Sequence, residues 1–269
     1  MTSEALHLKA RWLGCQRIEL ESCGSTNDEA ARLARAGASR GTVVIAERQT
    51  SGRGRDGRVW ESPPGGLYLS IVLRPPLAIA AVPPMTLAIG IAVCEAARAF
   101  GAHSELKWPN DVLVDGRKLA GVLVETQSQG NRLESVVVGI GINLHGRNGT
   151  LPDTVRDRAI TLEEAAGNGA IDREQFIERL LADVERWIER YVAVGLEAVI
   201  PAWQERMAHG LVARATPHTG VGGRIEGVVQ GLDEEGALLL CDDDGQVHKV
   251  HSGDVEVIRS PLIQSAASR

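Results

Sequence analysis

Three apolar runs rich in β-branched residues, separated by short turn signals, dominate residues 111–144. Asp115-Gly116 divides the first run from the second, 118–127, and Gly130-Asn131 divides the second from the third, 132–144. Such residue pairs favour tight reversals between antiparallel strands. Because helical segments are expected before and after this region, the chain is predicted to form a mixed sheet with interspersed helices, an α+β fold.

Further elements follow from hydrophobic periodicity and from residues that begin or end helices. Pro83-Pro84 opens an apolar, buried helix that is expected to reach about Gly101. From Asp172 onward, apolar residues recur at spacings of three and four, which predicts an amphipathic helix of about five turns. The other expected elements are strands at 16–20, 42–47, 67–74 and 105–108, a helix from Ser25 or Thr26 to about Gly37, and a helix near 196–208.

The pattern changes after the last of these helices. Residues 211–259 contain short apolar runs separated by turn signals, which is typical of a small β-barrel. We therefore expect two domains, a larger one at residues 1–209 and a small C-terminal β-barrel domain at residues 210–269.

The composition excludes several classes of protein. The 269 residues are 43% hydrophobic and 24% charged, as in globular proteins and unlike disordered chains. No apolar run approaches the ~20 residues that span a bilayer, and the N-terminus has no apolar signal segment, so we expect a cytoplasmic protein without membrane contact. The four cysteines and seven histidines show no ligand spacing, so neither a zinc site nor a disulfide framework is predicted.

The densest chemical signal is Gly52-Arg53-Gly54-Arg55-Asp56-Gly57-Arg58-Val59-Trp60, which we call the arginine loop. Its GxGxxG spacing matches dinucleotide and kinase loops, but the helix and acidic residue of a Rossmann site do not follow, and the other kinase motifs are missing. Arginine side chains and free backbone N–H groups suit a polyanion, and Trp60 can stack on a base or cover an apolar ligand. Taken alone, the segment could also be a solvated basic turn or a nucleic-acid patch.

Four other segments place polar groups or glycines where they could meet a ligand, and each has a structural alternative. In Lys107-Trp108-Pro109-Asn110-Asp111, the lysine suits a phosphate, the amide a base or ribose, and the carboxylate a cation, but the segment also fits a strand-to-turn junction. Lys118 could equally be a surface lysine at a strand end. Gly139 and Gly141 weaken a strand unless another group approaches its backbone, and Ser25-Thr26-Asn27 also fits a helix N-cap.

Together, five phrases resemble the biotin protein ligases in order and spacing. They are STN at 25–27, AERQTSGRGRDGRVW at 46–60, KWPNDV at 107–112, RKLAGVLVE at 117–125 and VVGIGINL at 137–144. The resemblance implies a mixed-sheet catalytic domain of the biotin/lipoate ligase type, similar to class II aminoacyl-tRNA synthetases, with a small SH3-like β-barrel at the C-terminus. Asp56 departs from the basic or polar residue often found at its position in this family.

The resemblance also implies a two-step reaction. Biotin attacks the α-phosphate of MgATP to give biotinyl-5′-AMP and pyrophosphate, and a lysine of a biotin carboxyl carrier protein or domain then accepts the biotinyl group. Joining two anions needs cations in fixed positions, which arginines, lysines and Mg²⁺ supply.

Residue roles carry over from the matching phrases. Catalytic roles are expected for Arg53, Arg55, Lys107, Asp111 and Lys118, with Asp111 also a candidate Mg²⁺ ligand or partner of the acceptor lysine. Biotin is expected to contact Ser25, Thr26, Asn27, Gln49, Arg53, Gly54, Arg55, Lys118, Gly121, Gly139 and Gly141. ATP and the adenylate are expected to contact Arg55, Arg58, Trp60, Lys107, Asn110 and Asn143.

The sequence is also compatible with two other functions. A lipoate or octanoyl ligase would share the fold, the lysine and the glycines, but it should lack the arginine loop. A non-enzymatic nucleic-acid-binding regulator would use the arginine loop and the C-terminal barrel. Against the regulator stand a net charge of −6, from 29 basic and 35 acidic residues, and only 24 residues before Ser25. We therefore expect no specific DNA binding; a homodimer is compatible with the sequence.

Overall fold

The structure is a computed structural model that describes residues 9–146, 151–167, 170–208, 211–217 and 223–259. Seven strands form the central sheet: β1 (Arg17–Cys23), β2 (Val43–Gln49), β3 (Leu67–Leu73), β4 (Glu105–Lys107), β5 (Asp111–Val114), β6 (Arg117–Gln129) and β7 (Arg132–Ile142). Five strands form the C-terminal sheet: β8 (Val212–Pro217), β9 (Ile225–Leu232), β10 (Leu238–Cys241), β11 (Val247–Val250) and β12 (Gly253–Arg259). The helices are α1 (Thr26–Arg35), α2 (Met85–Ala99), α3 (Leu162–Ala166), α4 (Arg173–Val194) and α5 (Leu196–Gln204).

The central sheet is mixed, as the sequence predicts. Its strand order is β1-β2-β3-β7-β6-β5-β4, and only the β1–β2 pair is parallel. The two expected hairpins are both present. Asp115 and Gly116 turn between β5 and β6 with φ of 50° and 74°, and Gly130 turns between β6 and β7 with φ of 58°. Positive φ at consecutive turn residues matches the right-handed twist of the strands, which explains the choice of Asp-Gly.

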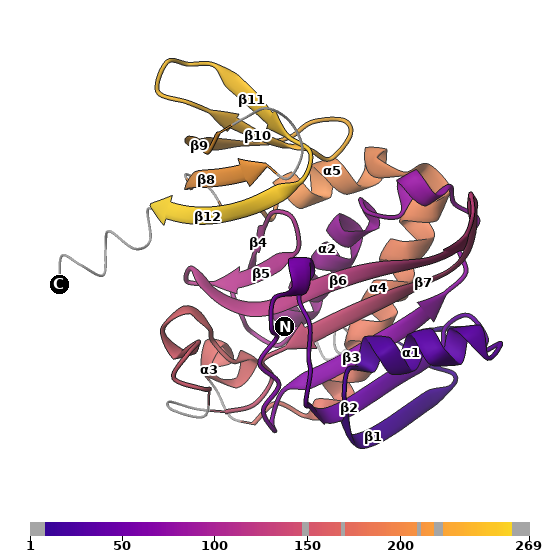
Figure 1. The fold of residues 1–269 in the computed structure, drawn as a ribbon. Coiled ribbons are helices and arrows are strands. Elements are labelled where there is room, and N and C mark those ends of the chain that lie inside the picture. The colour runs from indigo at the N-terminus through magenta and orange to yellow at the C-terminus, as the bar shows by residue number, and fades with distance from the viewer. Residues whose placement is uncertain (1–8, 147–150, 168–169, 209–210, 218–222, 260–269) are drawn as a thin grey trace.

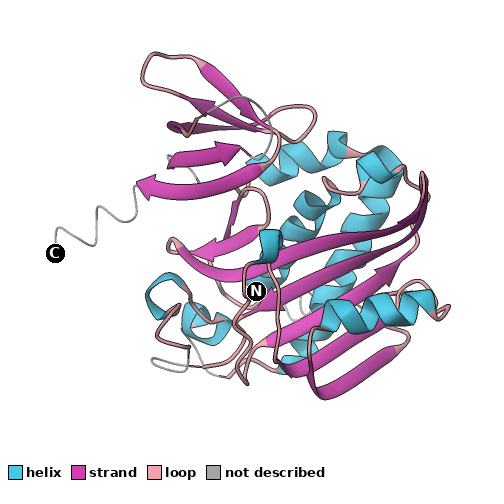
Figure 2. Cartoon of the chain, in the orientation of Figure 1, coloured by secondary structure: helices cyan, strands magenta, loops and turns pink. Residues whose placement is uncertain are grey.

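Helices cover the two faces of the central sheet unequally. Helix α1 lies on one face, and α2 and α4 lie on the other, as Figures 1 and 2 show. Alternation along the strands separates the two cores: Ile71 packs in the large cluster with α2 and α4, whereas Val72 packs in the small cluster beneath α1. Each face of the sheet therefore contributes side chains to a core, one beneath α1 and one beneath α2 and α4.

Helix α2 corrects one sequence expectation. Residues Ile79–Ala99 are long and apolar enough, by length and composition, to cross a membrane, so the statement that no apolar run approaches that length is wrong. Glu95 and Arg98 are the only charges in this stretch. Eleven residues of α2 are buried, and the helix packs against α4 and the central sheet. Its apolar composition is that of a core helix.

The C-terminal sheet is antiparallel throughout, in the order β11-β10-β9-β8-β12, and supplies the strands of the expected small barrel. Trp108, which lies between β4 and β5 of the central sheet, joins it to that sheet: its buried Nε1 donates a hydrogen bond of 3.0 Å to the carbonyl of Gly236. The domain boundary expected between residues 209 and 210 lies outside the described residues.

The remaining differences concern short elements. Helix α5 ends at Gln204 rather than near 208. No sequence pattern predicted α3, or the short 3₁₀ turns at Arg55–Gly57, Ile79–Ala81 and Arg156–Arg158. Elements of three to five residues carry too few positions for a periodic pattern to be recognised.

Candidate active site

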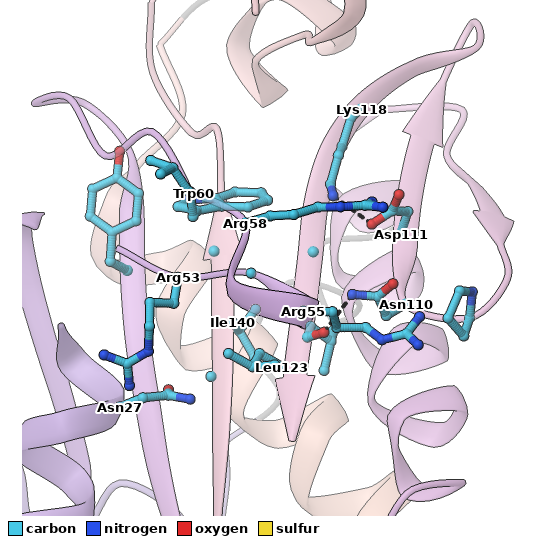
Figure 3. A pocket seen from close by; sticks show the side chains of 18 of the residues that line it. Asn27, Arg53, Arg55, Arg58, Trp60, Asn110, Asp111, Lys118, Leu123 and Ile140 are labelled. Carbon is cyan, nitrogen blue, oxygen red and sulfur yellow. Dashed lines mark hydrogen bonds and ion pairs between the residues drawn. The ribbon is translucent and has the colours of Figure 1, made fainter. Parts of the chain in front are cut away.

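One cleft gathers nearly all the residues singled out by sequence. It is lined by the start of α1, the end of β2, the arginine loop, the β4–β5 turn, the first half of β6 and the second half of β7 (Figure 3), and residues 253–255 of β12 also line it. Of the predicted site residues, only Asn143 lies outside this lining; it lines a second, larger cleft that continues from the first toward the C-terminal sheet. Segments more than 100 residues apart therefore meet at one site.

Glycines form the floor of the cleft. Gly121 of β6 pairs with Gly141 of β7, and the indole of Trp60 lies on both. A Cβ atom at Gly141 would lie 2.5 Å from Trp60 Cε2, and one at Gly121 would lie 2.9 Å from Trp60 Cζ3. A methyl group at either position would therefore displace the ring. A Cβ atom at Gly139 would lie 2.2 Å from Asn27 Oδ1, so this position must be glycine to leave room for the Asn27 side chain. The expectation that another group approaches this backbone is confirmed.

Trp60 holds one further contact. Lys118 Nζ lies 5.0 Å from the ring centroid of Trp60, in the geometry of a cation–π interaction. The buried indole Nε1 has no hydrogen-bond partner among the described residues. A buried N–H without an acceptor is costly, so this atom is suited to meet a polar ligand atom.

Hydroxyl and amide groups line the end of the cleft beside α1. Gln49 Oε1 accepts hydrogen bonds from the backbone N–H of Thr26 (2.8 Å) and from Thr26 Oγ1 (3.1 Å). Ser70 Oγ lies 2.8 Å from Thr26 Oγ1 and 2.5 Å from Asn27 Oδ1. Ser25 is buried and makes no capping hydrogen bond with its side chain, so a simple N-cap does not account for this segment. These groups form a fixed set of donors and acceptors.

Three charged side chains form a cluster at the opposite end. Asp111 Oδ1 lies 2.6 Å from Lys118 Nζ, and Asp111 Oδ2 lies 3.3 Å from Lys107 Nζ. Burial alone would raise the pKa of Asp111, but the two ammonium groups outweigh it and the pKa of this carboxyl is lowered. The cluster therefore carries one net positive charge and holds Lys118 at the mouth of the cleft.

The two expected adenylate-side amides hydrogen-bond to the backbone of β6. Asn110 Nδ2 donates to the carbonyl of Val122 (2.8 Å), and Asn143 Nδ2 donates to the carbonyl of Lys118 (3.1 Å). Neither side-chain oxygen accepts a hydrogen bond from a residue that the structure describes, so both can accept one from a ligand. Asn143 thereby fixes the backbone of the residue whose ammonium group lies beside Asp111.

The arginine loop is a closed turn. The backbone N–H of Trp60 donates to the carbonyl of Gly52 (2.9 Å), and that of Gly54 donates to the carbonyl of Arg58 (2.7 Å). At its tip Asp56 has a φ of 56°, a left-handed conformation that aspartate tolerates better than most residues. A Cβ at Gly52 would lie 2.5 Å from the carbonyl oxygen of Trp60, so this position needs glycine.

The three arginines of the loop have different surroundings. Arg53 forms two hydrogen bonds of 2.7 Å to the carboxylate of Asp28, and Arg58 pairs with Asp254 of β12. Arg55 lines the cleft and has no ion pair with any described residue. The sequence groups these residues as equivalent cations, whereas in the structure two of them are already neutralised by carboxylates.

A magnesium ligand is expected at Asp111 from the resemblance, and the donor set there does not fit one. Magnesium sites in proteins use carboxylates supplemented by phosphates and water. Asp111 instead lies between two ammonium groups, which oppose a divalent cation. Within the ranges that the structure describes, no three His, Cys, Asp or Glu side chains are placed to hold a metal ion. We assign no metal to this carboxylate.

Sequence reasoning missed two residues of the site: Ser70, which is fully buried and hydrogen-bonds to residues of the lining, and Asp254, which belongs to the lining. Ser70 looks like an ordinary strand residue until its neighbours Thr26 and Asn27 are known. Asp254 lies about 200 positions from the arginine loop, and only the packing of β12 against the cleft brings it to Arg58. No signal local to either residue could have identified it.

Comparison with known proteins gives a consistent result. The chain matches the model described as biotin/lipoate A/B protein ligase family over residues 21–143, and the biotin protein ligase C terminal domain over residues 220–257. It is 36% identical over 252 residues to the bifunctional ligase/repressor BirA of Bacillus subtilis, covering 93% of this chain and 76% of that protein. It is 35% identical to the biotin--[acetyl-CoA-carboxylase] ligase of Paracoccus denitrificans, covering 82% of this chain and 92% of the relative.

Solved structures agree. The biotin protein ligase from Aquifex aeolicus in complex with biotin and ATP superposes with a TM-score of 0.77 at 31% identity, covering 91% of this chain and all of the other. The biotin protein ligase from Leishmania major in complex with biotinyl-5-AMP superposes with a TM-score of 0.60 at 26% identity.

Proposed function

This chain belongs to the biotin protein ligase family, and we infer from its site how it performs ATP-dependent biotinylation. The enzyme activates biotin to biotinyl-5′-AMP and attaches biotin to protein. In the first step a biotin carboxylate oxygen bonds to the α-phosphorus of ATP, and the bond to the pyrophosphate leaving group breaks. In the second step an acceptor lysine amine attacks the acyl carbon, loses a proton, and AMP leaves.

The cleft supplies what the first step needs. Two anions must be held together, and the observation that carries our assignment is the Lys107–Asp111–Lys118 cluster facing the same cleft as the Thr26–Gln49 hydroxyl and amide groups. We assign the ureido ring of biotin to the hydroxyl and amide end. The carboxylate and the α-phosphate are assigned to the end with Lys118 and Arg55, where preoriented cations stabilise the developing charge.

The nucleotide occupies the wider cleft that continues toward the C-terminal sheet. Lys118, Trp60 and Asn143 border it, and Arg158 and Arg214 line it further out. Magnesium enters as part of MgATP, held by the phosphates rather than by Asp111. We assign the acceptor to the carrier domain of a biotin-dependent carboxylase. We place the reaction in the cytoplasm, a compartment that suits the four free cysteines.

Ligand-dependent pyrophosphate exchange tests this function. The purified protein is incubated with MgATP and labelled pyrophosphate, in parallel with biotin, with lipoate, or with neither. We expect label to enter ATP only with biotin. Exchange with lipoate in place of biotin would identify a lipoate ligase of the same fold, and no exchange with either acid would refute the assignment.

A further inference from the structure

The side chain of Arg53 is directed away from the reacting end of the cleft. Figure 3 shows Arg53 extending toward Asn27, while Arg55 extends toward Asn110. Both terminal nitrogens of Arg53 bond to Asp28, with Nη1–Oδ2 and Nη2–Oδ1 distances of 2.7 Å. This two-point geometry is the strongest that an arginine forms with a carboxylate. The guanidinium therefore joins the arginine loop to the first turn of α1.

A second carboxylate lies near the same guanidinium. Glu125 Oε1 of β6 is 3.9 Å from Arg53 Nη2, and Glu125 Oε2 accepts a hydrogen bond of 2.5 Å from Asn27 Nδ2. The orientation of the Asn27 amide is itself set, because its Oδ1 lies 2.5 Å from Ser70 Oγ. Asn27, Glu125, Arg53 and Asp28 thus form a continuous chain of polar contacts along one side of the cleft.

Charge balance argues against Arg53 as a phosphate ligand. Its guanidinium already faces two carboxylates, so a phosphate placed beside it would meet like charge and would have to break a two-point ion pair. The contact with Arg53 lowers the pKa of Asp28, which keeps that carboxylate charged at neutral pH. Arg55, two residues along the same loop, has no carboxylate partner among the described residues and lines the cleft.

The arginine loop also needs an anchor at this point. Gly52 and Gly54 flank Arg53, and a glycine on each side leaves the backbone free to adopt many conformations. An antiparallel bridge pairs Arg53 with Val59. Holding Arg53 in place therefore also holds the segment around Val59.

We propose that Asp28 and Glu125 are positioning residues that clamp Arg53 and so hold the arginine loop over the cleft, leaving Arg55 to meet the ligand anion. The clamp increases the fraction of molecules in which the loop is in the position that binds ligand. If the loop leaves this position for a fraction of the time, the apparent affinity for ligand falls by that fraction, while the chemical step in the bound state is little changed. The proposal rests on the biotin ligase function only for its kinetic readout.

The test compares Asp28→Asn with Glu29→Gln in the full-length chain. Both changes remove one negative charge from the first turn of α1, but Glu29 pairs with Arg32 of the same helix, whereas Asp28 pairs with Arg53 of the loop. In pyrophosphate exchange we expect Asp28→Asn to raise the KM for biotin about fivefold, the most that one partly exposed ion pair supports, with kcat changed less than about twofold. Glu29→Gln should leave both constants unchanged. Glu125→Gln should act in the same direction as Asp28→Asn but less, because of its longer contact.

A double-mutant cycle and a ligand-free measurement complete the test. Arg53→Met should reproduce the Asp28→Asn effect, and the double variant should be no worse than either single variant. Hydrogen exchange at residues 50–60 without any ligand should be faster in Asp28→Asn and in Arg53→Met than in the wild type, and unchanged in Glu29→Gln. Asp28→Glu should restore slow exchange at least in part.

Additive effects in the double variant, or exchange at residues 50–60 that is the same in Asp28→Asn and in the wild type, would overturn the clamp. A fall in kcat with no change in KM would also contradict it, since that would place Arg53 in the chemical step. Failure of the wild-type protein to exchange pyrophosphate would refute the enzymatic function alone, because the ligand-free measurement needs no activity.

Discussion

Lys118 Nζ lies 2.6 Å from Asp111 Oδ1 and 5.0 Å from the ring centroid of Trp60, so one ammonium group joins the buried carboxylate of β5 to the indole of the arginine loop. The side chain of Lys118 remains one-third exposed at the mouth of the cleft. Its position is therefore fixed before any ligand arrives, which is the condition for a cation to stabilise developing charge without reorganising.

Replacing Lys118 tests this directly. Lys118→Ala removes a preoriented cation, and we expect pyrophosphate exchange to fall by about 100-fold or more. Lys107 still pairs with Asp111, and the side chain of Lys118 lies outside the core, so the thermal unfolding midpoint should change little. Lys249→Ala, which breaks an ion pair with Asp233 in the C-terminal sheet, is the control. Wild-type exchange in a folded Lys118→Ala protein would contradict the assignment.

Gly141→Ala tests whether the indole of Trp60 must pack on the glycine backbone of β7. The added methyl group would lie 2.5 Å from Trp60 Cε2, so the indole must leave the floor of the cleft, and we expect exchange to fall roughly tenfold. Gly90→Ala in α2 is the matched control, since its Cβ would meet only Leu106 Cδ2 at an ordinary 3.5 Å. Equal activity of the two variants would show that Trp60 does not need this platform.

Arg55→Gly tests whether the arginine loop retains the intermediate. The change removes the loop's cation that has no ion pair with a described residue, and it adds backbone freedom. We expect the loop to close less well over biotinyl-AMP, so that the intermediate leaves faster and biotinylates lysines of bystander proteins. A rapid-filtration chase measures the release. If the Arg55→Gly variant retained biotinyl-AMP as long as the wild type does, the loop would not be what retains the intermediate.

Glu185 predicts a pH dependence of stability. It accepts hydrogen bonds from three consecutive backbone N–H groups, those of Arg11, Trp12 and Leu13, which ties the start of the described chain to α4. Burial alone would raise the pKa of Glu185, but these donors lower it overall. A carboxyl whose folded-state pKa is lowered stabilises the fold fully above its unfolded pKa, and it loses this contribution as pH falls through the folded pKa.

We therefore expect Glu185→Gln to lower the unfolding free energy by about 2 kcal/mol at pH 7, the range of hydrogen bonds to a charged acceptor. The difference from wild type should shrink as the pH falls below ~4.3, the ordinary pKa of glutamate. Urea unfolding at several pH values measures both. Glu178→Gln, which loses only a 3.6 Å contact with exposed Lys9, should show neither effect.

DNA binding gives a further prediction. A chain with a net charge of −6 should bind DNA only weakly, without sequence preference, and with strong salt dependence. Retention of a biotin-operon promoter fragment in preference to random DNA at physiological salt, with or without biotinyl-AMP, would contradict this expectation.

Local patterns in the sequence were enough to predict the architecture. The Asp115-Gly116 and Gly130-Asn131 turns and the periodic helix from Asp172 each carry their signal within a few residues, and all three are confirmed. Helix α3 was missed because five residues are too short for a periodic signal. The helix that follows Pro83-Pro84 was predicted, but the longer apolar stretch Ile79–Ala99, which begins before the two prolines, was not recognised.

The site was predictable as a set of residues but not as a set of partners. The arginine loop, the KWPND segment and the strand glycines were recognised, and the structure brings them into one cleft. Sequence alone could not show that Arg53 faces Asp28, or that Asp111 lies between two lysines, because pairing depends on which strands become neighbours. Three arginines that look alike in the sequence differ through contacts made by distant residues.

The hydrogen bond from Trp108 to the carbonyl of Gly236 bears on how such an enzyme could be recombined. Trp108 belongs to the segment that positions Lys107 and Asp111, yet its indole nitrogen is satisfied only by the tip of a hairpin in the C-terminal sheet. A chimaera that takes residues 211–259 from a distant relative would leave that nitrogen buried and unpaired unless the donated hairpin has the same length. The segment around Trp108 and the hairpin around Gly236 are therefore exchangeable between relatives only together. A change in the length of that hairpin would leave Trp108 without its acceptor.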